Sequence, residues 1–253
     1  MGRVAVKSRV NRSVRAKPSM NPILVALDLD TADEALAMAS KVRGQVGGLK
    51  VGSHLFTSEG PALVRALVER GDRVFLDLKF HDIPNTVASA VGAAASLGVW
   101  MLNVHASGGL TMMQAAKEAA DRARDRTGHR PLVIAVTVLT SFDQAMLEGT
   151  GVNRPIPTQV EHLAALTKEA GLDGVVASPH EIDAIRARCG SDFLIVTPGI
   201  RTGPVAPGDD QVRTRSAREA MDAGASYLVV GRPILKAADP AAAAQGIALT
   251  LKA

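Results

Sequence analysis

A regular alternation of short apolar runs with longer amphipathic segments constrains the fold of this chain more than any other feature. The apolar runs, rich in β-branched residues, have the composition of buried strands. They span residues 23–28, 48–51, 74–79, 100–105, 132–139, 174–178, 193–198 and 227–231. Segments with helical spacing follow them in turn, over residues 33–43, 61–69, 86–97, 110–126, 159–170, 180–188, 217–223 and 240–251. Strict alternation predicts a parallel sheet, and eight such units in about 230 residues predict a single α/β domain, a closed (β/α)8 TIM barrel.

An open, doubly wound sheet is the alternative arrangement of the same units. Such a sheet usually carries a glycine-rich fingerprint after its first strand, whereas here the first strand ends in Ala26-Leu27-Asp28-Leu29-Asp30, without glycine. The sequence therefore favours one barrel domain over residues 21–253, with its active site at the C-terminal ends of the strands. Thr31, with Glu34 three residues later, predicts a capping box at the start of the first helix.

The basic character of the chain lies in its first 20 residues. The formal net charge is +4, but residues 1–20 contain six of the 29 basic residues and none of the 25 acidic ones. This composition favours a disordered tail. The tail could contact nucleic acid electrostatically, yet it has no aromatic residue for stacking on bases, and we expect no nucleic-acid partner.

Cysteine content and hydropathy indicate the cellular setting. Cys189 is the only cysteine, which excludes an internal disulfide and leaves a cysteine-based metal site unsupported. No apolar run approaches the roughly 20 residues of a membrane span, and the tail lacks the apolar core of a secretory signal. We therefore expect a cytoplasmic protein without a membrane partner.

Residues 76–86, Leu-Asp-Leu-Lys-Phe-His-Asp-Ile-Pro-Asn-Thr, place three charges at the end of the third strand. Asp77 and Lys79 share one face of the strand because successive side chains alternate, and Asp82 follows three residues later. A solvated pair on an edge strand is the alternative, but the apolar flanks favour a buried strand. Because buried charges are rare unless they are paired or used, we interpret the three residues as a catalytic cluster.

Polar residues also follow most of the other strands, where barrel active sites lie. They are Asp28, Lys50, Asn103, His105, Thr140, Ser141, Arg201 and Arg232. For His105, a structural role through hydrogen bonding is favoured over a role as a catalytic base, and Asn103 is similarly ambiguous. A purely structural role does not explain the convergence of Asp28 and Lys50 with the catalytic cluster on one rim.

The ends of the last two strands predict a phosphate site. Gly231 lets the backbone approach an anion, Arg232 offers a fork of donors, and Pro233 suits a first helical turn. Arg201 is followed by a segment, residues 202–212, that is rich in glycine and proline. A loop of this length inside a compact domain is typical of a lid over an active site.

A metal ion or other cofactor is not expected. No candidate helix carries the histidine or cysteine spacing of a zinc site. Asp28 and Asp77 could supply ligands for Mg²⁺, but Lys50 and Lys79 stand among them as competing cations. Lys79 lies between two acids and should stay protonated, which argues against a Schiff-base lysine.

Seven segments, in order between residues 22 and 240, resemble the orotidine 5′-phosphate decarboxylase family. They are residues 25–28 (VALD), 49–52 (LKVG), 76–86, 103–106 (NVHA), 137–141 (TVLTS), 197–201 (TPGIR) and 230–233 (VGRP). The run Asp-x-Lys-x-x-Asp-Ile-Pro-Asn-Thr at 77–86 is the most specific of them. The resemblance implies an enzyme without cofactors that converts orotidine 5′-monophosphate to uridine 5′-monophosphate in de novo pyrimidine biosynthesis.

The resemblance also implies roles for individual residues. Lys79 would protonate carbon 6 of the pyrimidine, within a charged chain formed with Lys50, Asp77 and Asp82. The substrate contacts would be Asp28 and Lys50 at the ribose hydroxyls, Asp77 near the carboxylate, Thr140 at the pyrimidine, and Arg201, Gln211, Gly231 and Arg232 at the phosphate. In this family two subunits build each site, so Asp82, Ile83 and Thr86 would serve the neighbouring subunit of a homodimer.

Two other functions remain open. Sugar-phosphate decarboxylases and aldolases of the same barrel group share the Asp-x-Lys-x-x-Asp pattern but need Mg²⁺. They carry an acid near the end of strand two, where this chain has Lys50. A non-catalytic nucleotide or RNA binder is suggested only by the basic tail.

Overall fold

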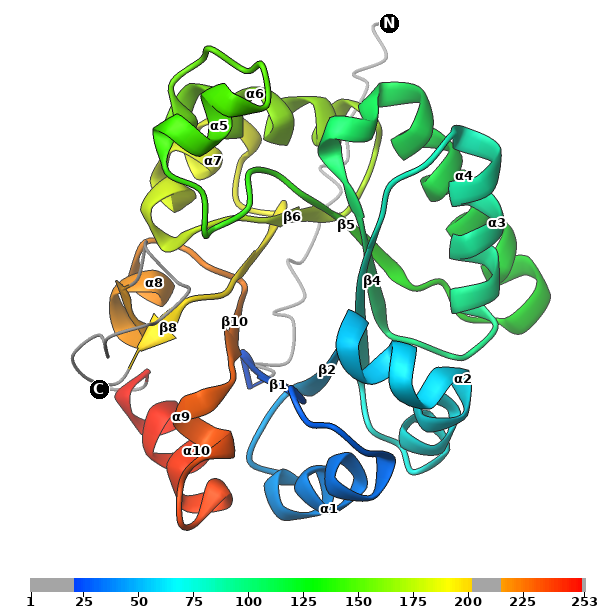
Figure 1. Cartoon of the computed structure of the whole chain (residues 1–253), viewed down its shortest axis with the longest axis vertical. Coiled ribbons are helices and arrows are strands. Elements are labelled where there is room, and N and C mark those ends of the chain that lie inside the picture. Colours follow the sequence, from blue (N-terminus) through cyan, green and yellow to red (C-terminus); the bar gives the residue numbers. More distant parts are fainter. Residues whose placement is uncertain (1–20, 202–214, 252–253) are drawn as a thin grey trace, which may run out of the picture.

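Eight parallel strands close into a barrel in the computed structural model, which describes residues 21–201 and 215–251 (Figure 1). The strands are β1 (Ile23–Ala26), β2 (Gly48–Gly52), β3 (Val74–Phe80), β4 (Met101–His105), β5 (Leu132–Val136), β6 (Gly174–Val176), β7 (Leu194–Thr197) and β10 (Tyr227–Val230). They follow the order β1-β10-β7-β6-β5-β4-β3-β2 around the barrel. The predicted closed barrel is confirmed, and an open sheet is excluded. The basic tail 1–20 and the predicted lid 202–212, with Gln211, lie outside the described residues.

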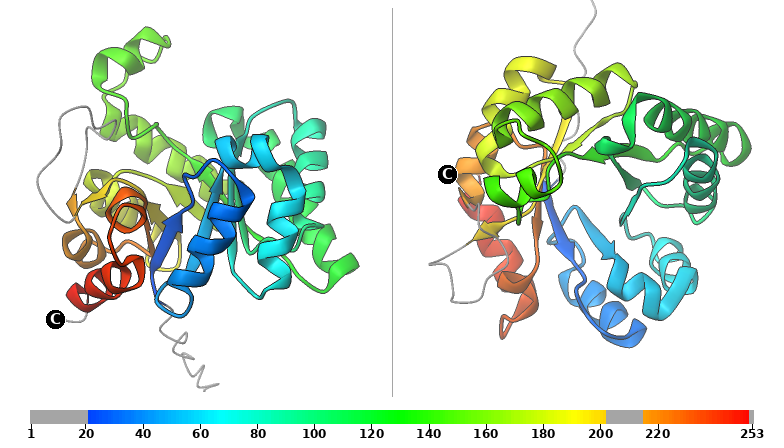
Figure 2. Two further views of the ribbon diagram at one scale, coloured as in Figure 1. Left: turned by 60° about the horizontal axis from the view of Figure 1, so that its bottom comes forward. Right: turned by 45° about the horizontal axis from the view of Figure 1, so that its top comes forward.

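Helices outside the barrel connect the strands (Figures 1 and 2). They are α1 (Ala32–Val42), α2 (Ser53–Glu69), α3 (Pro84–Ala95), α4 (Gly109–Thr127), α6 (Ile156–Glu169), α7 (Ile182–Cys189), α8 (Ala217–Asp222) and α10 (Pro240–Thr250). Shorter elements are α5 (Gln144–Gly149), α9 (Arg232–Leu235), the 3-10 turns Ala106–Gly108 and Pro179–Glu181, and a small sheet of β8 (Ile200–Arg201) with β9 (Arg215–Ser216). Among the helices of residues 21–201 and 215–251, none is long and apolar enough to cross a membrane.

Local sequence signals set the ends of the first two helices. Thr31 Oγ1 accepts a hydrogen bond from Glu34 N, and the Glu34 carboxylate accepts one from Thr31 N, both at 3.3 Å, so the predicted capping box is confirmed. The second helix begins at Ser53 and not at residue 61 as predicted. Gly60, with a positive φ of 67°, separates a first helical segment from a second one that begins at Pro61. The sequence prediction recognised only the second segment because proline marks a helix start.

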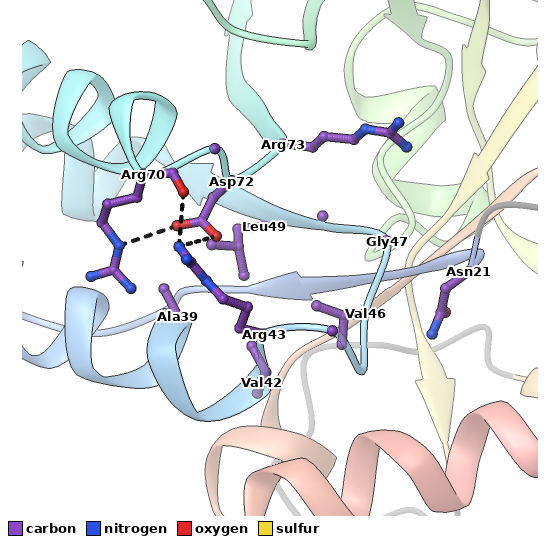
Figure 3. Close-up of a pocket in the computed structure, with 13 residues that line it drawn as sticks. Asn21, Ala39, Val42, Arg43, Val46, Gly47, Leu49, Arg70, Asp72 and Arg73 are labelled. Atoms are coloured by element: carbon purple, nitrogen blue, oxygen red, sulfur yellow. Dashed lines mark hydrogen bonds and ion pairs between the residues drawn. The ribbon is translucent and has the colours of Figure 1, made fainter.

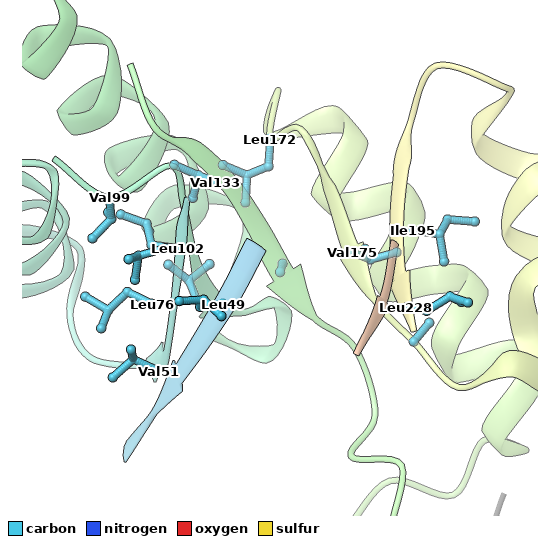
Figure 4. Close-up of a cluster of buried hydrophobic side chains, with 14 of the residues drawn as sticks. Leu49, Val51, Leu76, Val99, Leu102, Val133, Leu172, Val175, Ile195 and Leu228 are labelled. Atoms are coloured by element: carbon cyan, nitrogen blue, oxygen red, sulfur yellow. The ribbon is translucent and has the colours of Figure 1, made fainter. Parts of the chain in front are cut away.

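Apolar side chains pack on both sides of the strands. The inner cluster fills the barrel and contains Leu24, Ala26, Phe75, Met101, Ile134, Val196 and Val229. The larger outer cluster fills the space between the strands and the helices (Figure 4). On β3, Phe75 belongs to the inner cluster and Leu76 to the outer one. Because strand side chains alternate, Asp77 points into the barrel above Phe75.

An ion-pair cluster joins loops at the N-terminal end of the barrel (Figure 3). Asp72 Oδ1 accepts a hydrogen bond from Arg43 Nη2 (3.1 Å), and Arg70 Nε lies 3.4 Å from Asp72 Oδ2. Arg43 Nη2 also donates to the carbonyl of Arg70 (3.1 Å), whereas Arg73 extends away from the cluster. The adjoining cavity of about 340 Å³ lies at the end of the barrel where side chains serve stability. We therefore infer that this ion-pair cluster stabilises the fold.

Candidate active site

A cavity of about 590 Å³ lies at the C-terminal ends of the strands. Its lining includes eight residues that the sequence singled out: Asp28, Lys50, Asp77, Lys79, Thr140, Ser141, Gly231 and Arg232. They come from the ends of β1, β2, β3, β5 and β10, which the parallel barrel brings to one rim. The structure thus places these eight residues around one cavity. Their individual roles stay predictions.

Four of the lining side chains form a row of alternating charge. Lys50 Nζ lies 3.4 Å from both Asp28 Oδ1 and Asp77 Oδ2, and Lys79 Nζ donates to Asp77 Oδ1 at 2.8 Å. The side chains of Lys50 and Asp77 are only 12% and 13% exposed, whereas that of Lys79 is 36% exposed. Because water screens buried charges poorly, the middle of this row, Lys50 and Asp77, is held firmly by its neighbours.

The end of β3 departs from regular strand geometry at Lys79. Its φ of 52° lies in the left-handed region, and among the described non-glycine residues no other has a positive φ. Such a conformation costs about 1–3 kcal/mol. The register between β3 and β4 shifts at the same place, since Leu76 pairs with Leu102 but the next pair is Phe80 with Val104. Backbone strain of this kind is concentrated at functional sites, and the regular strand predicted from the sequence did not include it.

Asn103 and His105 both lie near the charged row. Asn103 is fully buried and hydrogen-bonds with Asp77 and Lys79. The His105 ring lies 5.4 Å from the His81 ring, tilted by 34°. Burial is the main cause that lowers the pKa of His105, the charges of His81 and Lys79 lower it further, and Asp77 opposes them. His105 is not among the residues that line the cavity, which favours a structural role.

The predicted partner-facing residues lie beside the cavity and do not line it. Asp82 Oδ1 accepts a hydrogen bond from Ile83 N (2.6 Å), and the Ile83 side chain is 66% exposed. Thr86, in the first turn of α3, is exposed as well. Within one chain, therefore, Asp82 is not brought into the row of charges, and its action on a neighbouring site stays a prediction.

Gly231 and Arg232 shape the end of the cavity formed by β10. Gly231 precedes α9, and the carbonyl of Gly231 accepts a hydrogen bond from Ile234 N (2.9 Å). A Cβ at position 231 would lie 3.4 Å from Asp28 Oδ2, so glycine leaves room between the backbone and that carboxylate. Arg232 is exposed at the first position of the helix. The backbone of Arg201 pairs with Ser216 in the small sheet.

Sequence reasoning missed the apolar wall of the cavity. This wall consists of Ala26, Phe75, Val136, Val138, Leu139, Val176 and Val229. Ala26, Val136 and Val176 are each the last residue of a strand, and alternation from the inner residues below them could have identified them. A wall of apolar groups lowers the local dielectric, which strengthens the interactions of the charged row.

The donor set at the rim does not fit the Mg²⁺ site of the sugar-phosphate alternative. Within the described ranges, no group of three or more His, Cys, Asp or Glu side chains is arranged to hold a metal ion. Asp28 and Asp77 are the carboxylates of the cavity, and Lys50 Nζ lies between them at 3.4 Å from each. An ammonium in that place competes directly with a metal cation.

A family model described as "Orotidine 5'-phosphate decarboxylase / HUMPS family" matches residues 21–247. The chain belongs to this family. Orotidine 5'-phosphate decarboxylase from Dichelobacter nodosus is 54% identical over 231 residues, which cover 91% of this chain and 99% of the relative. The enzyme of the same name from Legionella pneumophila is 52% identical over 218 residues, 86% of this chain and 93% of the relative.

Solved structures agree with this membership. The crystal structure of orotidine 5'-phosphate decarboxylase from Lactobacillus acidophilus matches with a TM-score of 0.82 and 37% identity, covering 92% of this chain and all of that chain. An uncharacterized conserved protein from Geobacillus kaustophilus matches with a TM-score of 0.80 and 42% identity, covering 91% of this chain and all of that one. The barrel fold is thus shared with a decarboxylase over nearly the whole chain.

Proposed function

We propose that this chain decarboxylates orotidine 5′-monophosphate to uridine 5′-monophosphate without a cofactor, as a carboxy-lyase of pyrimidine biosynthesis, with Lys79 as the proton donor. The observation that carries the proposal is the row Asp28–Lys50–Asp77–Lys79 at the mouth of the barrel, in a chain 52–54% identical to named decarboxylases. The proposed setting is the cytoplasm, in keeping with a biosynthetic enzyme that carries a single cysteine.

The reaction requires a fixed positive charge at carbon 6. When the bond between carbon 6 and the carboxylate breaks, the electron pair stays on carbon 6, where no carbonyl or cofactor can delocalise it. A preorganised charge aimed at this position stabilises the developing anion. Lys79 Nζ supplies that charge and then transfers a proton to carbon 6, after which the neutral amine regains a proton from solvent.

Asp77 makes the site favour the loss of CO₂ from the bound substrate. Its carboxylate contacts Lys79 at 2.8 Å, so a substrate carboxylate beside Lys79 also lies near Asp77. Repulsion between the two carboxylates disappears as CO₂ leaves, whereas the attraction of Lys79 to carbon 6 grows. Lys50, paired with both Asp28 and Asp77, balances the buried charge of Asp77.

The other lining residues fit the rest of the nucleotide. Asp28 and Lys50 would bind the ribose hydroxyls, and Thr140, on the opposite side of the barrel rim, would contact the pyrimidine. Arg232 and the backbone at Gly231 would bind the phosphate together with Arg201 and Gln211. Binding energy gained at the phosphate is remote from carbon 6 and can be used to align the charges around it.

We also propose that the enzyme is a homodimer with shared sites. Asp82, Ile83 and Thr86 lie exposed at the rim, and an isoleucine that is 66% exposed suits burial against a second copy. A two-fold interface would place each loop 82–86 at the partner's cavity.

Product analysis tests the proposed reaction. Purified protein should convert orotidine 5′-monophosphate to equal amounts of CO₂ and uridine 5′-monophosphate. A phosphorylated β-keto sugar acid supplied with Mg²⁺ should not be decarboxylated. Turnover of the sugar acid alone would contradict the proposal and favour the other branch of the barrel group.

A further inference from the structure

The most constrained polar side chain near the charged row is Asn103, in the middle of β4. It is fully buried, and it is not among the residues that line the cavity. Asn103 Nδ2 donates a hydrogen bond to Asp77 Oδ1 (2.7 Å), and Asn103 Oδ1 accepts one from the backbone N–H of Lys79 (2.8 Å). One amide therefore contacts both members of the Asp77–Lys79 pair.

The chemistry of its partners fixes the orientation of this amide. A carboxylate oxygen can only accept a hydrogen bond, and a backbone N–H can only donate one. Rotating the Asn103 amide by half a turn would place oxygen against oxygen at Asp77 and N–H against N–H at Lys79. The planar amide of Asn103 thus uses its donor at Asp77 and its acceptor at Lys79.

The backbone pairing explains why a side chain is needed here. Leu76 pairs with Leu102 and Phe80 pairs with Val104. Asn103 alone therefore stands opposite the three residues 77–79 of β3. At this irregularity, the amide of Asn103 provides the partner for the Lys79 N–H that a regular ladder would supply from its backbone.

We propose that Asn103 is a positioning residue for the decarboxylation, which holds the Lys79 backbone in its left-handed conformation and the Asp77 carboxylate against the Lys79 ammonium before the substrate binds. This inference rests on the roles proposed above for Lys79 and Asp77. Without the amide, the Lys79 N–H would lose its buried partner and the chain would relax toward a regular strand, which would move the ammonium away from its set place.

Two substitutions separate positioning from mere stability. Asn103→Ala removes both hydrogen bonds. We expect kcat to fall by about 100-fold or more, since a displacement of about 1 Å at the reacting groups has that effect. The Kd for uridine 5′-monophosphate should change by less than about threefold, because the ribose and phosphate groups are untouched. Folded Asn103→Ala protein that keeps more than about half of the wild-type kcat would overturn the proposal.

Asn103→Asp should change how kcat/KM depends on pH, an effect that is not expected if Asn103 only stabilises the fold. The new carboxylate keeps the acceptor for Lys79 N–H but faces Asp77 Oδ1 with a like charge, which raises the pKa of the pair. When the pair takes up a proton, an O–H replaces the lost Nδ2 donor. The kcat/KM of the variant relative to wild type should therefore rise at least about tenfold from about pH 8 to about pH 5.5. A ratio independent of pH would overturn the proposal, even if Asn103→Ala fails to fold.

Thr167→Ala is the matched control. Thr167 is equally buried, and its hydroxyl donates to the carbonyl of Leu163 within α6 (2.7 Å), away from the cavity. This control should lose stability but keep the wild-type kcat and pH profile. Lys79→Ala distinguishes failure of the inference about Asn103 from failure of the role proposed for Lys79. An inactive Lys79→Ala beside a nearly normal Asn103→Ala would refute only the inference, whereas an active Lys79→Ala would refute the proposed role of Lys79 itself.

Discussion

The ammonium of Lys79 lies 2.8 Å from Oδ1 of Asp77, a residue two positions earlier on the same strand. In a regular strand the Cα atoms of such residues stand about 6.6 Å apart, and side chains on one face extend side by side. At Lys79 the backbone turns into the left-handed region instead. With the Lys79 backbone in this strained conformation, the charged pair of Asp77 and Lys79 is formed before any substrate binds.

Lys79→Ala should abolish nearly all turnover of orotidine 5′-monophosphate while the protein stays folded. One preorganised donor is worth about 100-fold or more in kcat, and this one also delivers the proton. The measurement is kcat by absorbance, with circular dichroism to verify folding. Lys168→Ala, on the outer helix α6, is the matched control and should keep wild-type activity. A Lys79→Ala enzyme with more than about a tenth of the wild-type kcat would remove Lys79 from the mechanism.

Mixed dimers should reveal the shared site. Lys79→Ala and Asp82→Asn are each expected to be inactive, and co-refolding them should restore activity because each mixed dimer holds one site with both residues intact. Random mixing would restore about a quarter of all sites. The measurement is the activity of the mixture, with mixed dimers counted by mass spectrometry. Mixed dimers without recovered activity would place Asp82 in the site of its own subunit.

Arg232→Ala should lower kcat/KM for orotidine 5′-monophosphate by about 30- to 1,000-fold, since a charge-assisted contact to phosphate contributes about 2–4 kcal/mol. The guanidinium would act far from carbon 6, through binding energy that aligns the charged groups. Steady-state kinetics check the effect, and Arg218→Ala, a cation of α8 paired with Asp222, should have little influence.

The nucleoside orotidine is the decisive control for Arg232. Orotidine has no phosphate, so Arg232→Ala and wild type should decarboxylate it about equally well. Equal impairment on both substrates would show that Arg232 is not a phosphate ligand and that the assignment of the β10 end of the cavity is wrong.

His105 should make stability depend on pH below neutrality. Burial lowers the pKa of His105 in the folded chain, whereas the unfolded chain titrates near the usual value of about 6.5. As the pH falls below about 6.5, the unfolded state binds a proton that the folded state resists, so the free energy of unfolding decreases. Urea unfolding should show a shallower acid loss for His105→Asn than for wild type. An identical loss would assign the effect to other groups, and His162→Asn, on exposed α6 surface, controls for removal of a histidine.

The barrel could be predicted from the sequence because its signals are local. Apolar runs such as Val74–Leu76 mark strands, and glycine and capping residues mark helix ends. The position of Asp28, Lys50, Asp77 and Lys79 on one rim then followed from the topology alone. These steps need only periodicity and the rule that parallel strands end on the same side.

Other features depend on tertiary contacts that no local pattern encodes. The left-handed backbone at Lys79 is held by the hydrogen bond that its N–H donates to Oδ1 of Asn103, a residue 24 positions away. Asp77 and Lys79 on their own fit a regular strand. The short helix α5 was not predicted because six residues are too few for periodicity. The sequence signal available for this helix was its N-cap residue Asp143, whose carboxylate accepts a hydrogen bond from Met146 N (2.8 Å).

The most direct test of a metal-independent, lysine-driven decarboxylation is the absorbance of orotidine 5′-monophosphate incubated with the wild-type enzyme and excess EDTA. We expect the absorbance change to proceed to completion at the same rate with and without the chelator, because Lys79 and Asp77 carry the chemistry by themselves. No turnover in EDTA, with activity restored by Mg²⁺, would contradict a metal-independent reaction.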